Sequence, residues 1–199
     1  MEERLTTMAP QLDLFAGESQ WPHGFAYKLG FLEPAEEEEL VGRIAQLPFE
    51  PFAFHGFLGK RRIVSFGWQY VFDGSGLRRT EDIPPFLLPY RDRAAALAGL
   101  TPEDMQHVLV TEYAPGAGIG WHKDRSVFGE VVGLSLLAPA RLRFRRRRGE
   151  RWERRSLTAE PRSAYLLRGE SRTQWEHSIP AVDALRYSIT FRNFREDAL

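Results

Sequence analysis

The sequence predicts a mainly β protein of the α+β class, in which helices come first and an antiparallel β-structure, closed as a barrel or jelly roll, follows. Two segments in the first half have the composition and apolar spacing of helices. From about residue 107 onward, apolar and polar residues alternate, which is the period of a half-buried strand. With 199 residues and 43% hydrophobic content, the chain can bury one substantial core, so we expect a single domain.

Two helices are expected before residue 107. In "EPAEEEELVGRIAQL", residues 33–47, Pro34 suits the first helical turn and the glutamates at 36–39 favour the positive N-terminal end of a helix. The apolar stripe of this helix consists of Leu40, Ile44 and Leu47. The second candidate is "PYRDRAAALAGL", residues 89–100.

Six short β-rich runs follow, separated by Gly, Pro or charged turns. They are "HVLVTEY" (107–113), "VVGLSLL" (131–137), "RLRFR" (141–145), "WERRSLTA" (152–159), "SAYLLR" (163–168) and "RYSITFR" (186–192). There is no internal repeat and no low-complexity linker, which again favours one domain.

Composition restricts both the metal chemistry and the compartment. The chain has no cysteine, so disulfides, zinc-thiolate sites and iron–sulfur clusters are excluded, and any metal must be held by nitrogen and oxygen ligands. No apolar run approaches the length of a membrane span. The N-terminal stretch "MEERLTTMAPQLDLFAGES" lacks the basic and apolar regions of a signal peptide. We therefore expect a cytoplasmic protein with no membrane partner.

The charge is distributed unevenly although the formal net charge is zero. Residues 1–100 carry 10 Lys and Arg against 14 Asp and Glu, whereas residues 101–199 carry 17 against 13. Most of the basic excess lies in "RLRFRRRRGERWERR", residues 141–155, which contains nine arginines. Such a run is either a solvated face or a phosphate-binding strip. The candidate phosphate contacts are Arg145, Arg146, Arg147 and Arg148.

The stretch "GWHKD", residues 120–124, places His122 and Asp124 two positions apart. On an extended strand, side chains at i and i+2 leave the same face, so the imidazole and the carboxylate would project side by side. A surface pair joined by a hydrogen bond would have the same spacing, so a metal site requires a third ligand.

His177 in "QWEHSIP" is the best candidate for this ligand, because it follows a β-rich run and precedes a turn that contains proline. Two imidazoles and one carboxylate on one side of a metal form the facial triad of non-haem Fe(II) oxygenases, which leaves positions open for a cosubstrate and O₂. The spacing alone is weak evidence for such a site.

The last predicted strand, "RYSITFR", has one apolar and one polar, cationic face. Its polar face consists of Arg186, Ser188, Thr190 and Arg192, and its apolar face of Tyr187, Ile189 and Phe191. The two arginines lie about 20 Å apart along the strand, and side chains curled toward one another would leave room for a small dicarboxylate. Arginine binds carboxylates through a bidentate fork. A 2-oxo dicarboxylate could therefore chelate iron at one end while an arginine holds the other.

Three stretches in this order, "EYAPGAGIGWHKD", "GESRTQWEHSIP" and "RYSITFR", resemble the AlkB family of Fe(II)- and 2-oxoglutarate-dependent dioxygenases. The resemblance begins near "GFAYKLGFLEPAEEEEL" and continues nearly to the C-terminus. It implies a double-stranded β-helix (jelly roll) with N-terminal helices packed on it and a nucleotide-recognition lid. The expected layout is one dioxygenase domain over residues 21–199, with the lid at about 52–90 and the jelly-roll core at about 105–195.

The resemblance also implies a site and an activity. Fe(II) would bind His122, Asp124 and His177. The 2-oxoglutarate would be held by Tyr113, Arg186 and Arg192, with Ser188 and Thr190 lining its pocket. With O₂ as the second cosubstrate, the implied reaction is oxidative dealkylation of N-alkylated nucleobases in DNA or RNA, which releases succinate, CO₂ and an aldehyde.

Two positions depart from the family pattern. Thr111 stands where many members have an asparagine, so a hydrogen bond to the cosubstrate must change or move. Ser126 stands where some repair members carry a second acidic residue, which leaves the base preference open.

The lid would have to accept a base that has left its stack. "SFGWQYVFDGSG" offers Trp68, Tyr70 and Phe72 at alternate positions, preceded by the basic "GKRR". Within this stretch "QYVFDG" resembles part of the family's lid, which makes Tyr70 and Phe72 the main candidates. The alternative is that all three aromatic residues belong to the core.

A possible partner is indicated by "QLDLF", which consists of Gln11, Leu12, Asp13, Leu14 and Phe15 and lies within the N-terminal segment 1–20. It resembles the short peptide by which many bacterial replication and repair proteins bind the DNA sliding clamp. Leucine and phenylalanine would occupy an apolar pocket and glutamine would fix the orientation. The alternative is that this segment packs on its own domain.

The function predicted from these features is that of a nucleic-acid dealkylase. Two alternatives stay open: an iron and 2-oxoglutarate hydroxylase of a protein or small molecule, and a catalytically silent nucleic-acid-binding jelly roll. The intact candidate triad and arginines favour an enzyme, and the arginine strip favours a nucleic-acid substrate. The residues do not distinguish DNA from RNA, one alkyl adduct from another, or monomer from oligomer.

Overall fold

The computed structural model describes residues 20–54, 57–71 and 76–195. The strands before residue 80 are β1 (Phe25–Lys28), β2 (Glu50–Phe54), β3 (Phe57–Phe66), β4 (Trp68–Val71) and β5 (Gly76–Arg79). The later strands are β6 (His107–Tyr113), β7 (Ile119–His122), β8 (Phe128–Leu136), β9 (Ala140–Arg148), β10 (Arg151–Ala159), β11 (Ser163–Leu167), β12 (Glu176–Ile179) and β13 (Arg186–Phe194). The helices are α1 (Pro34–Ile44), α2 (Leu88–Ala98) and α3 (Gly169–Thr173), with short 3₁₀ turns η1 (Pro85–Leu87) and η2 (Pro102–Asp104).

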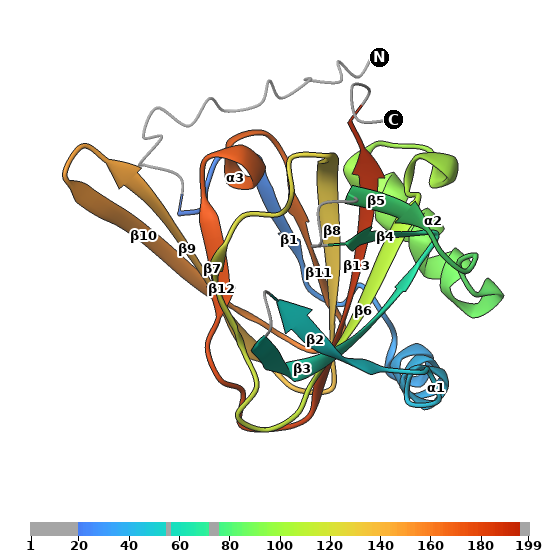
Figure 1. Ribbon diagram of the computed structural model, residues 1–199. Helices are drawn as coiled ribbons and strands as arrows, with labels where there is room; N and C mark the ends of the chain where they lie inside the picture. The colour runs from blue at the N-terminus through green and yellow to red at the C-terminus, as the bar shows by residue number, and fades with distance from the viewer. Residues whose placement is uncertain (1–19, 55–56, 72–75, 196–199) are drawn as a thin grey trace, which may run out of the picture.

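Two antiparallel sheets form the body of the domain (Figure 1). The major sheet has the strand order β1-β11-β8-β13-β6-β3-β2, and the minor sheet has the order β10-β9-β12-β7. Strands that are distant in the sequence are neighbours in both sheets, as when β13 pairs with β6 on one side and β8 on the other. This arrangement is the predicted jelly roll, so the fold class is confirmed.

The helices α1 and α2 cover the face of the major sheet that points away from the minor sheet (Figure 1). A first core lies between these two helices and the major sheet. It includes Leu40 and Ile44 from α1, Ala95 from α2, and Ile189 and Phe191 from β13. Both helices were predicted from their sequence. No helix in the described part of the chain is long and apolar enough to cross a membrane.

A second core lies between the two sheets and contains Phe144, Leu142, Tyr113, Tyr165 and Trp175. Burying side chains of this size contributes about 1.5–3 kcal/mol each to the stability of the fold. Strand β13 also sends polar side chains into the space between the sheets. Its apolar residues face α1 and α2, so the residues that alternate with them point to the opposite side; these are Arg186, Ser188, Thr190 and Arg192. The predicted division of β13 into two faces is therefore confirmed.

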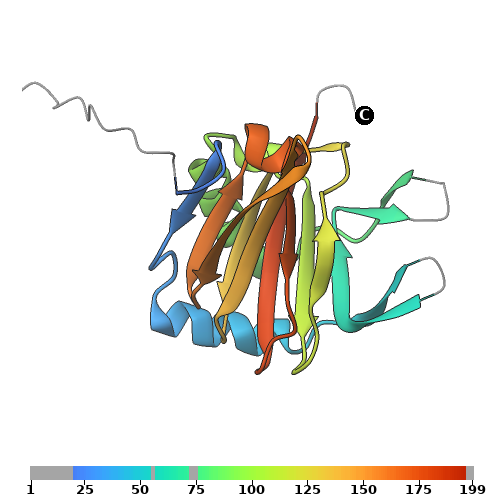
Figure 2. The same ribbon diagram turned by 90° about the vertical axis from the view of Figure 1, so that its left-hand side faces the viewer.

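The structure differs from the prediction in the order of its elements. Strand β1 precedes α1, and strands β2–β5 lie between α1 and α2, so the helices do not come first. Within the region predicted as a lid, β3 pairs with β6 in the major sheet, whereas β4 and β5 form a separate two-stranded hairpin. Figure 2 shows the β2–β3 and β4–β5 hairpins projecting on the same side of the barrel.

Candidate active site

Strands β7 and β12 bring His122 and His177 face to face. The two residues are direct partners in the antiparallel register, and their ring centroids lie 4.2 Å apart. His177 is also opposite Phe144 on β9, whose side chain is fully buried, so both imidazoles point between the two sheets. Pairing with β9 and β7 therefore brings together two histidines that are 55 positions apart in the sequence.

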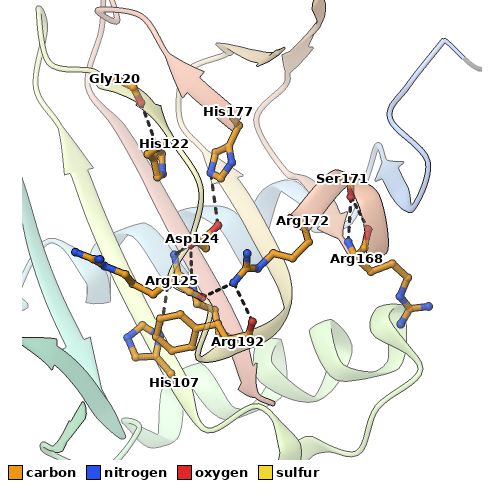
Figure 3. Close-up of polar contacts among 11 residues, drawn as sticks. His107, Gly120, His122, Asp124, Arg125, Arg168, Ser171, Arg172, His177 and Arg192 are labelled. Carbon is orange, nitrogen blue, oxygen red and sulfur yellow. Dashed lines mark hydrogen bonds and ion pairs between the residues drawn. The ribbon is translucent and has the colours of Figure 1, made fainter. Parts of the chain in front are cut away.

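Asp124 reaches the same interior from a loop. Strand β7 ends at His122, so the prediction that His122 and Asp124 share one strand face is wrong in its detail. The Asp124 side chain nevertheless lies beside His177, with 3.6 Å between Oδ2 and Nε2 (Figure 3). Its other oxygen, Oδ1, accepts hydrogen bonds from Nε and Nη2 of Arg192 at 3.1 and 2.9 Å.

The protonation of these three side chains suits metal binding. Burial, together with the neighbouring His122, lowers the pKa of His177 to about 3, and burial also lowers the pKa of His122. Burial alone would raise the pKa of Asp124, but Arg192 and the two histidines hold it below its usual value. At neutral pH the group therefore consists of two neutral imidazoles and one carboxylate, which is a donor set used by non-haem Fe(II).

Two further observations fit a cation at this position. Oδ2 of Asp124 is buried and has no hydrogen-bond partner among the described residues. Nδ1 of His122 lies 2.9 Å from the carbonyl oxygen of Gly120, which places the ring proton on Nδ1 and leaves Nε2 with a free lone pair. No group of three His, Asp or Glu side chains in the described part of the chain is already arranged as a complete metal-binding cluster.

Arg186 is the clearest candidate for a cosubstrate contact. Its side chain is fully buried at the start of β13, next to Tyr113, whose ring centroid lies 5.0 Å from the guanidinium carbon. Nε and Nη2 donate to the hydroxyl of Ser135 at 3.3 and 3.2 Å, and Nη1 has no partner among the described residues. A buried guanidinium without a carboxylate partner is costly, so this position suits the distal carboxylate of 2-oxoglutarate.

Arg192 lies at the other end of β13 and has a different environment. Its Nε and Nη2 both donate to Oδ1 of Asp124, and its Nη1 lies 3.4 Å from Nδ1 of His107. Between the two arginines, Ser188 lies opposite Thr111 of β6 in register, and Thr190 donates to the carbonyl oxygen of Leu109 at 3.3 Å. The structure thus brings together the candidate residues from β6 and β13, and it places Arg192 against Asp124, one of the candidate metal ligands.

The predicted lid residues occupy different environments. Tyr70 lies under the guanidinium of Arg125, at 4.8 Å from ring centroid to Cζ, and Arg125 directly follows Asp124. Trp68 instead packs edge-on against Phe194 with centroids 5.5 Å apart, and it is half-buried and part of neither core. Phe72 lies outside the described residues, as does the predicted clamp peptide.

A cavity of about 470 Å³ adjoins the site on the side of Asp124. Its wall includes Ser126, a candidate substrate contact, together with the basic Lys123, Arg168 and Arg172. Sequence reasoning missed Arg172. This buried residue donates from Nη2 to the carbonyl oxygens of Arg125 and Phe128, the latter at 2.8 Å (Figure 3), and so holds the loop that carries Asp124. Its position inside "GESRTQWEHSIP" was the only available signal.

The four arginines predicted to form a phosphate-binding strip do not all point to the same side of the minor sheet. Arg145 and Arg147 point outward from β9, where both lie against Trp152. Arg146 points inward and forms ion pairs with Glu153 at 2.8 Å and Glu170 at 2.9 Å. The exposed Arg148 ends β9.

Acidification is expected to destabilise the metal-free protein. Because the pKa of His177 is about 3 in the fold and near 6.5 in an unfolded chain, the unfolded state binds an extra proton within this window. His122 and His107 shift in the same direction, so the free energy of unfolding should fall as the pH drops from about 6.5 toward 3. Urea denaturation between pH 7.5 and 4.5 measures this. Substituting His177→Gln should weaken the dependence, and an unchanged pH profile in that variant would contradict the assignment.

Comparison with known proteins shows the family to which this chain belongs. Curated relatives include the "Alkylated DNA repair protein ALKBH8 homolog" of Arabidopsis thaliana, 27% identical over 83% of this chain and 54% of the relative. Another is the "Probable RNA/DNA demethylase ALKBH6" of Danio rerio, 31% identical over 51% of this chain and 41% of the relative. The chain thus spans about half the length of these relatives.

Solved structures with the same fold include OsALKBH1, with a TM-score of 0.68 at 16% identity over 85% of this chain and 96% of that structure. A prolyl-4-hydroxylase of Pseudomonas putida has a TM-score of 0.59 at 14% identity over 87% of this chain and 94% of that structure. The model of the 2OG-Fe(II) oxygenase superfamily matches residues 67–192, which include all candidate metal and cosubstrate residues. The chain therefore belongs to the 2OG-Fe(II) oxygenase superfamily, whose members use Fe(II) with 2-oxoglutarate and O₂ as cosubstrates.

Proposed function

We propose that this oxygenase removes N-linked alkyl groups from nucleobases in DNA or RNA. The observation that carries the substrate class is the contact between Tyr70 and Arg125, the residue that follows Asp124 in the sequence. An aromatic face suits an extruded base and a guanidinium suits the phosphate next to it. The relatives named as a DNA repair protein and a probable RNA/DNA demethylase support the same class.

In this proposal each part of the site has one task. His122, Asp124 and His177 hold Fe(II), and Arg192 orients Asp124 through its two hydrogen bonds. Arg186 binds the distal carboxylate of 2-oxoglutarate, and the rest of the cosubstrate contacts four buried residues nearby, Thr111, Tyr113, Ser188 and Thr190. The buried surroundings exclude water from the reacting groups.

The bound metal supplies oxidation driven by decarboxylation of 2-oxoglutarate: one oxygen atom of O₂ ends in succinate, the other on the alkyl carbon of the base. The bond between the nitrogen and the hydroxylated carbon then breaks and the carbon leaves as an aldehyde; the hydroxyl proton passes to the nitrogen of a neutral base, or to solvent when the alkylated base is cationic. A methylated base thus releases one formaldehyde for each succinate and CO₂.

A panel of alkylated oligonucleotides tests this function. The protein, loaded anaerobically with Fe(II) and then given O₂, should restore at least one N-methylated or etheno-bridged base, with succinate and repaired base formed in equal amounts. Single strands should react at least as well as duplexes, because little unpairing is needed there. Succinate without base repair across DNA and RNA would indicate a hydroxylase of proteins or small molecules. Absence of any succinate would indicate the silent binding module.

We also propose that residues Gln11–Phe15 bind a bacterial sliding clamp. Substituting Leu14 and Phe15 with alanine should abolish clamp binding, because these side chains would fill the apolar pocket. Activity on short oligonucleotides should stay unchanged. Surface plasmon resonance with a purified clamp measures the first effect. A wild-type protein that binds no clamp would refute the proposal, and loss of folding in the variant would favour packing of the segment on its own domain.

A further inference from the structure

The outward face of the minor sheet carries a series of arginines at alternate positions of β9. The even-numbered residues Leu142 and Phe144 are buried between the sheets. The intervening residues therefore point away from the barrel. These outward arginines are Arg141, Arg143, Arg145 and Arg147, to which β10 adds Arg154, the direct partner of Arg145.

Two tryptophans complete this face, and Arg145 lies between them. Trp121 precedes the inward-pointing His122 on β7 and so points outward, with the guanidinium carbons of Arg143 and Arg145 at 4.9 and 4.5 Å from its ring centroid. Trp152 on β10 has Arg145 at 4.3 Å and Arg147 at 5.1 Å. Arginine and tryptophan side chains thus form one continuous layer across all four strands, which we call the Arg–Trp face.

The charge of the Arg–Trp face is strongly positive although the whole chain is neutral. Among the described outward residues of these strands, the acidic one is Glu176, which pairs with Arg145 at 2.5 Å. Arg143 donates to the hydroxyl of Ser178 and Arg141 to that of Ser156, so neither is neutralised by these contacts. The excess of positive charge is complementary to a polyanion.

The spacing and the aromatic rings specify which polyanion. Alternate residues of a strand lie about 6.6 Å apart, so the arginines of β9 form an evenly spaced row suited to successive phosphates of an extended chain. Both tryptophans are half-buried beside these arginines. A partly exposed tryptophan ring can stack an unpaired base, whereas the bases of a duplex are already stacked on one another. Trp121 lies on the outer side of β7, and the next residue, the candidate metal ligand His122, points to the inner side, so one edge strand carries parts of both the row and the candidate site.

We propose that the Arg–Trp face binds single-stranded nucleic acid on one side of the base that is dealkylated. This inference rests on the proposed function and refines it: Arg143, Arg145 and Arg147 contact the strand, and the inward Arg146 does not. Trp121 and Trp152 stack bases that flank the target.

Fluorescence anisotropy with an unmodified single-stranded 16-mer, without iron or 2-oxoglutarate, tests the proposal independently of catalysis. The double variant Arg143→Gln and Arg147→Gln should weaken binding at least 10-fold. It should also reduce the slope of log K against log salt by about 1.4, because two phosphate contacts are lost. The control variant Arg43→Gln and Arg91→Gln removes the same charge from α1 and α2 and should change neither quantity. Trp152→Leu should weaken binding about 5-fold or more, and Trp152→Tyr should restore part of it.

The outcomes separate the Arg–Trp face from the proposed chemistry. Loss of 16-mer binding in the double variant, with no base repaired by the wild type, would support the Arg–Trp face and refute the dealkylase. Normal base repair with unchanged 16-mer binding in the double variant would refute the Arg–Trp face alone. Equal affinity for duplex and single strand, insensitive to Trp152→Leu, would refute the single-strand assignment. If Trp152→Leu fails to fold by circular dichroism, the arginine variants decide the question.

Discussion

Replacing Arg186 with alanine is expected to raise the 2-oxoglutarate concentration needed for half-maximal turnover by at least about 30-fold, because removing one partner of a buried charge pair costs about 2 kcal/mol or more. The guanidinium is fully buried and has no acidic partner among the described residues, so the cosubstrate carboxylate is the proposed counter-ion. Succinate formation at varied 2-oxoglutarate measures the effect. Arg91→Ala on α2 is a suitable control that should leave it unchanged.

The same variant has a second readout that does not depend on turnover. In the wild-type protein, 2-oxoglutarate with a redox-inactive metal should raise the melting temperature, since a ligand that binds only the folded state stabilises it. Arg186→Met should abolish this increase while leaving the ligand-free protein at least as stable, because an uncompensated buried charge has been removed. If Arg186 variants changed only the affinity for oligonucleotides, the cosubstrate assignment would be wrong.

Replacing Asp124 with alanine is expected to abolish turnover and to remove most of the Fe(II) affinity. The variant loses the only carboxylate of the proposed ligand set, and it leaves the largely buried Arg192 without its ion-pair partner. The second effect alone should destabilise the fold by about 3 kcal/mol. Asp124→Asn is therefore the sharper variant, because it keeps the shape and can still accept a hydrogen bond from Arg192.

Metal binding by these variants can be followed anaerobically. Equilibrium dialysis gives the Fe(II) stoichiometry, and a charge-transfer absorption band on addition of 2-oxoglutarate reports cosubstrate binding at the metal. We expect one iron and a band for the wild type, and neither for Asp124→Ala. The Asn variant should fold like the wild type and bind iron more weakly. Unchanged iron binding and turnover in the alanine variant would remove Asp124 from the site.

Regular periodicity explains which parts of the fold were predictable. The helical stripe of α1 and the alternation along β6 and β13 are visible in the residues, because one face of each element is buried against a large core. Strand β3 was missed because "GKRR" interrupts its alternation, and its strand conformation follows from pairing with β6. The short strand β7 likewise depends on its pairing with β12.

The candidate site likewise has residues that local sequence patterns reveal and residues whose positions depend on distant contacts. His122, His177 and Arg186 were found from motif spacing, and the structure brings the two histidines together. Strand β7 ends before Asp124, a boundary that spacing alone could not show. The arginine run was read as one strip, although strand alternation already separates Arg145 and Arg147 from Arg146 and Arg148. The role of Arg172 in holding the loop depends on a contact across about 45 residues, which no local pattern reveals.

The most direct test of this account is a crystal structure of the protein grown anaerobically with Fe(II) and 2-oxoglutarate, with iron located by its anomalous scattering. We expect a single iron peak within bonding distance of His122 Nε2, a carboxylate oxygen of Asp124 and His177 Nε2. The distal carboxylate of 2-oxoglutarate should lie against Nη1 of Arg186. Iron bound elsewhere, or 2-oxoglutarate bound away from Arg186, would contradict the proposed site.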